Sequence, residues 1–213
     1  YFRLNQYQES IETGLRTLEE NPRRPDTHLL LSRAYGATQQ YQKARHYLRR
    51  TLEIDPQNGM AHYDYGHLLY KEKNYSKAIF HLRRASEWNT HDAWTHYELG
   101  RALHHLGEES AALHAYQRAW QIEPPLPAAA NAIGSLHFVA GRLQQARLYF
   151  SRALDRAPDN LEAQINLGLL DVEEGYISKG IERLQQLRDQ YPNSSTARNA
   201  LQEVQQRAEQ TKR

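Results

Sequence analysis

Histidine is the residue of this chain that could do the most varied chemistry, and its eleven copies could bind a metal ion. His104 and His105 are adjacent, so on a helix they point to different sides. His28, His62 and His96 recur at a long fixed interval, which on stacked helices would separate them by about 10 Å. Zinc ligands must lie within about 2 Å of one point. The histidines therefore predict no metal site. We expect the imidazole rings to be half-buried packing groups, and any ring that is buried would make stability depend on pH.

No other group of residues predicts catalysis. The glycines do not form a phosphate-binding loop. Serine, histidine and aspartate never occur in the sequence context of a catalytic triad. Cysteine is absent, which excludes disulfides and thiolate metal sites. The sequence therefore predicts a protein that is not an enzyme and that holds no metal and no cofactor.

Composition excludes two further classes of partner. The 213 residues carry a net charge of +2, and their basic residues do not cluster into a stripe, so nucleic acid is not an expected partner. The chain has no run of 18 apolar residues, so no segment is expected to span a membrane.

The elements that must position any binding residue follow a period of 34 residues. One set of small residues recurs at this interval, namely Ser32, Gly66, Gly100, Gly134 and Gly168. A second set does so as well, namely Ala44, Ala78, Ala112, Ala146 and Gly180. Proline follows the same interval at 22, 56, 124, 158 and 192, with Thr90 at the missing step. A fixed period of this length indicates stacked copies of one helical unit, which form a solenoid.

Each copy is expected to hold two helices. In the first full copy, residues 26–38 show helical apolar spacing, and residues 41–54 form a second helix that Asp55 and Pro56 terminate. The small residues would be notches where two helices about 8–10 Å apart approach most closely. A glycine in mid-helix costs about 1 kcal/mol relative to alanine, so its recurrence indicates a steric demand. On second helices, the large residues that pack into these notches would be Leu48, Leu82, Tyr116, Phe150 and Leu184.

One copy carries a family resemblance through Leu99, Gly100, Leu103, Gly107, Ala112, Tyr116, Ala119 and Pro124. This pattern resembles the tetratricopeptide repeat almost position for position. The resemblance implies an all-α, right-handed superhelical α-solenoid of antiparallel helix pairs. Five repeats would occupy 25–58, 59–92, 93–126, 127–160 and 161–194. The sequence departs from the family pattern where His28, His62 and His96 replace a tryptophan, where Asp171 replaces an apolar residue, and where Gly180 replaces an alanine.

The two ends of the array differ. We expect residues 195–213 to be a capping helix and tail, with an N-cap near Ser194 and an apolar face through Leu201 and Val204. Residues 1–24 would be an incomplete repeat, mainly its second helix from Tyr7 to Glu20, which residues upstream would complete. If nothing upstream does so, Ile11, Leu15 and Leu18 would expose an apolar face that favours pairing with another chain.

The resemblance also implies where a partner would bind, because first helices in this family line a concave groove that takes peptides. The groove residues selected here are Arg33, Met60, Tyr63, His67, Tyr70, Trp94, Tyr97, Arg101, His104, Asn131 and Phe138. Large aromatic residues with arginine are the types enriched at binding hot spots. The alternative is that the aromatic rings only pack against neighbouring helices. Asp64 and Glu98 lie three residues before His67 and Arg101, and would pair with them along the helix.

Two subtypes of the family do not fit. The carboxylate clamp of heat-shock co-chaperones needs a lysine where this chain has Leu29. The asparagine ladder of the glycosyltransferase type would need asparagine at five matching positions, of which only Asn166 fits. We therefore expect neither mode of peptide recognition.

Three functions remain open from the sequence. The first is a non-catalytic scaffold or adaptor that binds a peptide or helix of a partner protein, for instance in bacterial envelope, secretion or pilus assembly. The second is the docking domain of a larger enzyme, such as a transferase linked to these repeats. The third is an oligomer that assembles through the N-terminal end. We expect a soluble protein of the bacterial periplasm, envelope or cytoplasm.

Overall fold

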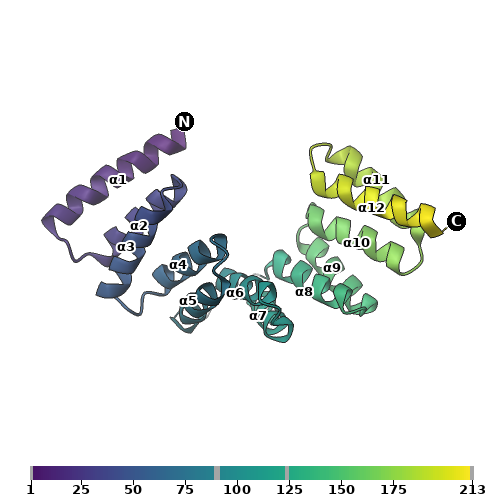
Figure 1. Cartoon of the computed structure of the whole chain (residues 1–213), viewed down its shortest axis with the longest axis horizontal. Coiled ribbons are helices and arrows are strands. Elements are labelled where there is room, and N and C mark those ends of the chain that lie inside the picture. The colour runs from purple at the N-terminus through teal and green to yellow at the C-terminus, as the bar shows by residue number, and fades with distance from the viewer. Residues whose placement is uncertain (1, 89–91, 123–124, 212–213) are drawn as a thin grey trace. The chain divides into compact units, whose positions relative to one another are not determined.

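The protein is all-α throughout the part of the chain that the structure, a computed structural model, describes (Figure 1). That part comprises residues 2–88, 92–122 and 125–211. It forms twelve helices: α1 (Phe2–Glu20), α2 (Pro25–Ala37), α3 (Tyr41–Ile54), α4 (Gly59–Lys71), α5 (Tyr75–Trp88), α6 (Ala93–His105), α7 (Glu109–Gln121), α8 (Pro127–Val139), α9 (Leu143–Arg156), α10 (Leu161–Glu173), α11 (Ile177–Gln190) and α12 (Ser195–Thr211). Two positions of the repeat pattern, Thr90 and Pro124, lie outside the described residues.

Consecutive helices pack as pairs, which is the architecture of an α-solenoid. Helix α2 packs on α3, α4 on α5, α8 on α9 and α10 on α11. The first helices of the pairs, together with α12, begin at intervals of 34 residues. The turn inside each pair places one residue at a positive φ, and these residues are Gln39, Lys73, Gly107, Gly141 and Gly175. The predicted fold class of antiparallel helix pairs is confirmed.

The chain divides into two compact units, and the division falls within α7. Unit 1 is residues 1–115 and unit 2 is residues 116–213.

The core of unit 1 lies between successive helices. Ile11 of α1 packs with Leu31, Tyr35 and Ala44. A Cβ added to Gly14 of α1 would lie 2.8 Å from Leu31 Cδ2, so a glycine is needed at this crossing. A neighbouring cluster joins Leu29, Leu48, Ala61 and Leu68.

The notch interpretation holds in both units. In unit 1 a Cβ on Gly66 would lie 2.6 Å from Leu82 Cγ. In unit 2 a Cβ on Gly134 would lie 2.6 Å from Phe150 Cδ1. These distances are shorter than van der Waals contact, so each glycine faces the large partner that the sequence assigned to it.

Unit 2 ends in a helix that covers the preceding pair. Ala197, Ala200, Leu201 and Val204 of α12 are buried against the cluster that contains Leu184 of α11. The helix begins where the sequence placed its cap, because the backbone N–H of Ala197 donates to Ser194 Oγ at 3.2 Å. An amphipathic helix in this position shields the last apolar surface of a helical array from water.

The N-terminal helix differs from the expectation. It is continuous from Phe2 to Glu20, and so begins five residues before Tyr7. The expected exposed apolar face is wrong for Ile11, which is 4% exposed, and Leu18 also packs against the cluster of α2. Only Leu15, at 38% exposure, fits the expectation. The reason is geometric, since spacings of three and four residues turn Ile11, Gly14 and Leu18 together toward α2.

Candidate protein-binding face of unit 1

Nine of the selected groove residues lie on three successive first helices of unit 1. Arg33 is on α2, four lie on α4 and four on α6, each set spaced three, four and three residues apart, which keeps it on one side of its helix. We call the surface formed by Met60, Tyr63, Tyr70, Trp94, Tyr97 and Arg101, with Arg33 and His67 beside them, the aromatic–arginine face. His104 is exposed at the end of α6.

Contacts between neighbouring helices hold this face together. Arg33 Nε of α2 donates to Asp64 Oδ2 of α4 at 2.5 Å. The guanidinium of Arg101 on α6 lies 4.4 Å from the centre of the Tyr70 ring on α4, a cation–π contact. His105 Nε2 of α6 lies 2.8 Å from the Tyr70 hydroxyl, so this ring is fixed from two directions.

A buried carboxylate lies beneath the cations. Glu98 is 4% exposed, and Arg101 Nη1 donates to its two oxygens at 3.0 and 3.3 Å. His67 Nδ1 lies 3.8 Å from Glu98 Oε2. Burial alone would raise the pKa of Glu98, but His67 and Arg101 outweigh it and hold that pKa below its usual range. Glu98 therefore stays ionised and fixes the position of Arg101 at the surface.

The two acidic residues pair differently from one another. The pairing of Glu98 with Arg101 along α6 is confirmed. Asp64 was expected to pair with His67 on its own helix, yet its hydrogen bond comes from Arg33 of the preceding helix. Burial raises the pKa of Asp64 while Arg33 lowers it, and the net direction is upward.

The aromatic residues divide between packing and exposure. Burial, followed by the nearby carboxylates of Glu98, Asp92 and Asp64, raises the pKa of Tyr63 to about 12, so its hydroxyl stays protonated. Tyr63 stacks near His67, with the ring centres 6.3 Å apart. The tyrosines of this face are therefore half-buried among neighbouring side chains, whereas two of its large side chains are exposed to solvent.

Trp94 and Met60 are the open side chains of this face. Trp94 is 50% exposed and meets Tyr97 edge-to-face, with the ring centres 5.7 Å apart. Met60 is 57% exposed. On α2, Leu30 is 48% exposed whereas Leu29 is only 7% exposed. Leu29 packs on Leu48 and Ala61, and a run of three leucines gives no signal that separates these roles.

The last two selected residues lie in unit 2. Asn131 of α8 is 7% exposed; its Oδ1 accepts from Asn166 Nδ2 at 2.9 Å and its Nδ2 lies 3.4 Å from Glu162 Oε2. Phe138 packs on the cluster of Ala146 and Phe150. Within unit 2 both side chains are therefore engaged in packing and internal hydrogen bonds.

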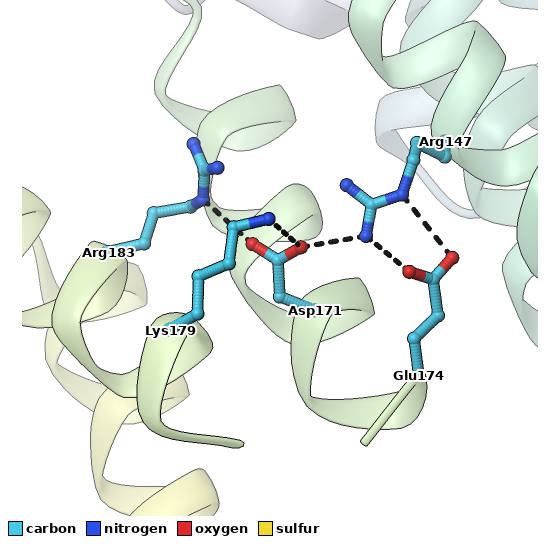
Figure 2. Close-up of polar contacts among 5 residues, drawn as sticks. All are labelled: Arg147, Asp171, Glu174, Lys179 and Arg183. Atoms are coloured by element: carbon cyan, nitrogen blue, oxygen red, sulfur yellow. Dashed lines mark hydrogen bonds and ion pairs between the residues drawn. The ribbon is translucent and has the colours of Figure 1, made fainter. Parts of the chain in front are cut away.

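A buried ionic network also lies in unit 2, at a position that the sequence marked only as a departure from the family pattern. Asp171 of α10 is fully buried and is surrounded by three cations (Figure 2). Its Oδ1 lies 2.7 Å from Arg147 Nη2 of α9 and 3.2 Å from Lys179 Nζ of α11, and its Oδ2 lies 3.2 Å from Arg183 Nε. Glu174 also binds Arg147, at 2.6 Å. The network ties three helices together, and sequence alone could not show which cations converge on Asp171.

Among residues 2–88, 92–122 and 125–211, no three histidine or carboxylate side chains gather in a way that could hold a metal ion. Over the same residues, none of the helices is both long and apolar enough to cross a membrane.

These helix pairs define the chain as an α-solenoid, and comparison with known proteins gives the family. A family model described as tetratricopeptide repeat matches residues 37–93, 69–136 and 137–204. The chain therefore belongs to the tetratricopeptide repeat family.

Three proteins illustrate what the chain resembles. The Protein CTR9 homolog of Arabidopsis thaliana is 38% identical over 99 residues, which are 45% of this chain but only 9% of that protein. The solved structure of PilW, a type IV pilus biogenesis factor, has a TM-score of 0.81 at 20% identity and covers 94% of this chain and 93% of its own. The structure of YrrB, a repeat protein with an unusual peptide-binding site, has a TM-score of 0.72 at 22% identity, covering 89% and 98% of the two chains. At these identities the two structures establish the fold alone.

Proposed function

We propose that this protein is a non-catalytic scaffold that binds a peptide or helix of a partner protein on the aromatic–arginine face of unit 1. The observation that carries the proposal is that Trp94 and Met60 are half exposed on the face that also contains Arg101, whose guanidinium is fixed by buried Glu98. Exposed large apolar residues next to a pre-positioned arginine are typical of binding hot spots.

The likeness to a repeat protein with a peptide-binding site supports this general role. The likeness to a pilus biogenesis factor supports a finer proposal, which is a place in bacterial envelope, secretion or pilus assembly. The partial match to a much longer plant protein supports a role as the docking segment of a larger chain. In each setting the same face of α4 and α6 would contact the partner.

The test is a double substitution of the exposed side chains, Met60→Glu with Trp94→Glu. Both side chains project into solvent, so we expect helical content by circular dichroism and the unfolding midpoint to change little. We expect affinity for a partner or peptide selected on the wild-type protein to fall by about tenfold or more. Phe80→Glu is the matched control, because Phe80 is an equally exposed aromatic residue on α5. Undiminished affinity of the double variant would exclude this face.

A further inference from the structure

A small pocket opens beside the aromatic–arginine face between α2, α3 and α4 of unit 1. Its volume is about 150 Å³. Ala44, Leu48 and Leu68 form an apolar floor, and Arg33, Tyr41 and Lys71 are among the residues around it. A cavity of about this size in another protein holds a benzene molecule, so the pocket fits one aromatic ring.

Gly36 is the reason why the pocket is open. Gly36 lies in the last turn of α2, and a Cβ built on it would meet no atom within 4 Å. The residue at the same place one repeat later is Tyr70. The Tyr70 ring lies 5.5 Å from the ring of Tyr75 and 5.4 Å from that of His105.

The neighbours of these two positions also correspond. Tyr41 and Lys71, which line the pocket, are the counterparts of Tyr75 and His105 at the interval of 34 residues. The second repeat therefore fills the space between the two helix pairs with its own tyrosine ring, whereas the first repeat has no side chain to place there.

We propose that this pocket receives a tyrosine or phenylalanine side chain from the partner segment that the proposed function requires. The pocket is continuous with the aromatic–arginine face, since Arg33 and His67 belong to both. A ring entering between Tyr41 and Lys71 would take the place that Tyr70 takes in the next repeat.

The charges around the pocket select the residues next to that ring. Asp64 is the acidic residue that lines the pocket, and Arg33 already binds it. Arg33 keeps 51% of its side chain exposed, whereas Asp64 keeps only 20%. Lys71 is exposed beside them. A carboxylate next to the aromatic residue of the partner would complement this excess of positive charge.

The test uses a short capped peptide, acetyl-Gly-Ser-Glu-Tyr-Glu-Ser-Gly-amide, titrated into the isotope-labelled full chain and followed by NMR. We expect saturable shifts at the backbone amides of Gly36, Tyr41 and Lys71. Gly36→Tyr fills the pocket from inside and should weaken this binding by about tenfold or more. Gly36→Ala leaves the ring space open and should bind like the wild type. Peptides with alanine for tyrosine, or with lysine for both glutamates, should bind more weakly.

Two results would overturn the pocket. The first is the absence of saturable shifts at these amides up to millimolar peptide. The second is peptide binding that Gly36→Tyr leaves unchanged. If the shifts were then confined to the surroundings of Trp94, the pocket would be excluded and the proposed function would stand. If the variant with Met60→Glu and Trp94→Glu loses a selected partner but keeps the peptide-induced shifts at the pocket, the pocket binds its peptide independently of these two side chains.

Discussion

The Nδ1 atoms of His62 and His81 lie 3.0 Å apart, and this contact assigns a tautomer to each ring. His62 Nε2 lies 3.1 Å from the carbonyl oxygen of Pro56, which can only accept, so this nitrogen carries the hydrogen. His62 Nδ1 is then the acceptor, and His81 Nδ1–H donates to it. Both rings are neutral in this arrangement, and a proton added at His62 Nδ1 would place two N–H groups against each other.

Stability should therefore depend on pH through this pair. Burial lowers the pKa of His62, and burial with the nearby charge of His62 lowers the pKa of His81 from 6.5 to about 4. As pH falls below about 6.5, the unfolded chain binds protons that the folded chain does not, so the folded state loses stability. The contribution of the neutral histidine pair to stability is fully present above pH 6.5 and is lost as pH falls toward about 4. Urea unfolding followed by circular dichroism across this range should show it.

The variant His81→Phe separates this pair from other titrating groups. Phenylalanine keeps a ring next to Tyr65, whose centre lies 4.4 Å from that of His81. We expect the free energy of unfolding to fall less steeply with decreasing pH in the variant than in the wild type. The difference should be on the order of 1 kcal/mol, because one pKa unit corresponds to about 1.4 kcal/mol and partial exposure of His81 reduces the effect. Parallel curves for the two proteins would show that the pair does not control the pH dependence.

The period of 34 residues predicted the fold and most of the core, because helix pairing needs small and large residues at fixed places. Gly66 opposite Leu82 and Gly134 opposite Phe150 follow from spacing alone. The surface was harder to predict, since spacing gives the side of a helix but not the partner of a side chain. Arg33 of α2 binds Asp64 of α4, and no local sequence pattern distinguishes this contact between two helices from an ion pair within α4.

Single positions escaped prediction where the chain departs from its own repeat. Gly36 stands where the next repeat has Tyr70, and only the helices around it show that it leaves a pocket. Likewise, Asp171 reads as a polar residue at an apolar position until Arg147, Lys179 and Arg183 are seen to converge on it. The selected groove residues themselves stay a prediction until binding is measured.

Asp171→Asn should destabilise unit 2. Burial by itself would raise the pKa of Asp171, but the three cations around it outweigh burial and lower that pKa. The carboxylate therefore stabilises the folded state at pH values above the pKa that it has in the unfolded chain. Removing one partner of a buried ion pair costs about 3–5 kcal/mol, and the exposed ends of Lys179 and Arg183 should reduce this to about 2–3 kcal/mol. Urea denaturation at neutral pH measures the change. Glu173→Gln, on the exposed side of α10, is the control and should cost less than about 0.5 kcal/mol.

Lys73→Gly should stabilise unit 1. Lys73 has a φ of 60° in the turn between α4 and α5, where the equivalent turns use Gly107 and Gly141. A side chain in this left-handed region costs about 1–2 kcal/mol, which glycine avoids, whereas glycine loses more entropy on folding. We expect a net gain of about 0.5 kcal/mol in thermal or urea unfolding. Lys77→Gly, inside α5, should have the opposite sign, and a loss of stability in both variants would contradict this explanation of the turn.

Alanine should have opposite effects at two helical glycines. A Cβ on Gly180 would lie 2.4 Å from Val172 Cγ2 and 2.7 Å from the carbonyl oxygen of Gly168, so α10 and α11 would have to separate. Gly180→Ala, which restores the residue usual in the family, should therefore cost about 1–3 kcal/mol in spite of the higher helix propensity of alanine. Gly36→Ala meets no neighbouring atom and should stabilise α2 by up to about 1 kcal/mol. If both substitutions increased the free energy of unfolding, helix propensity, and not the approach of the neighbouring helix, would decide the residue at these positions.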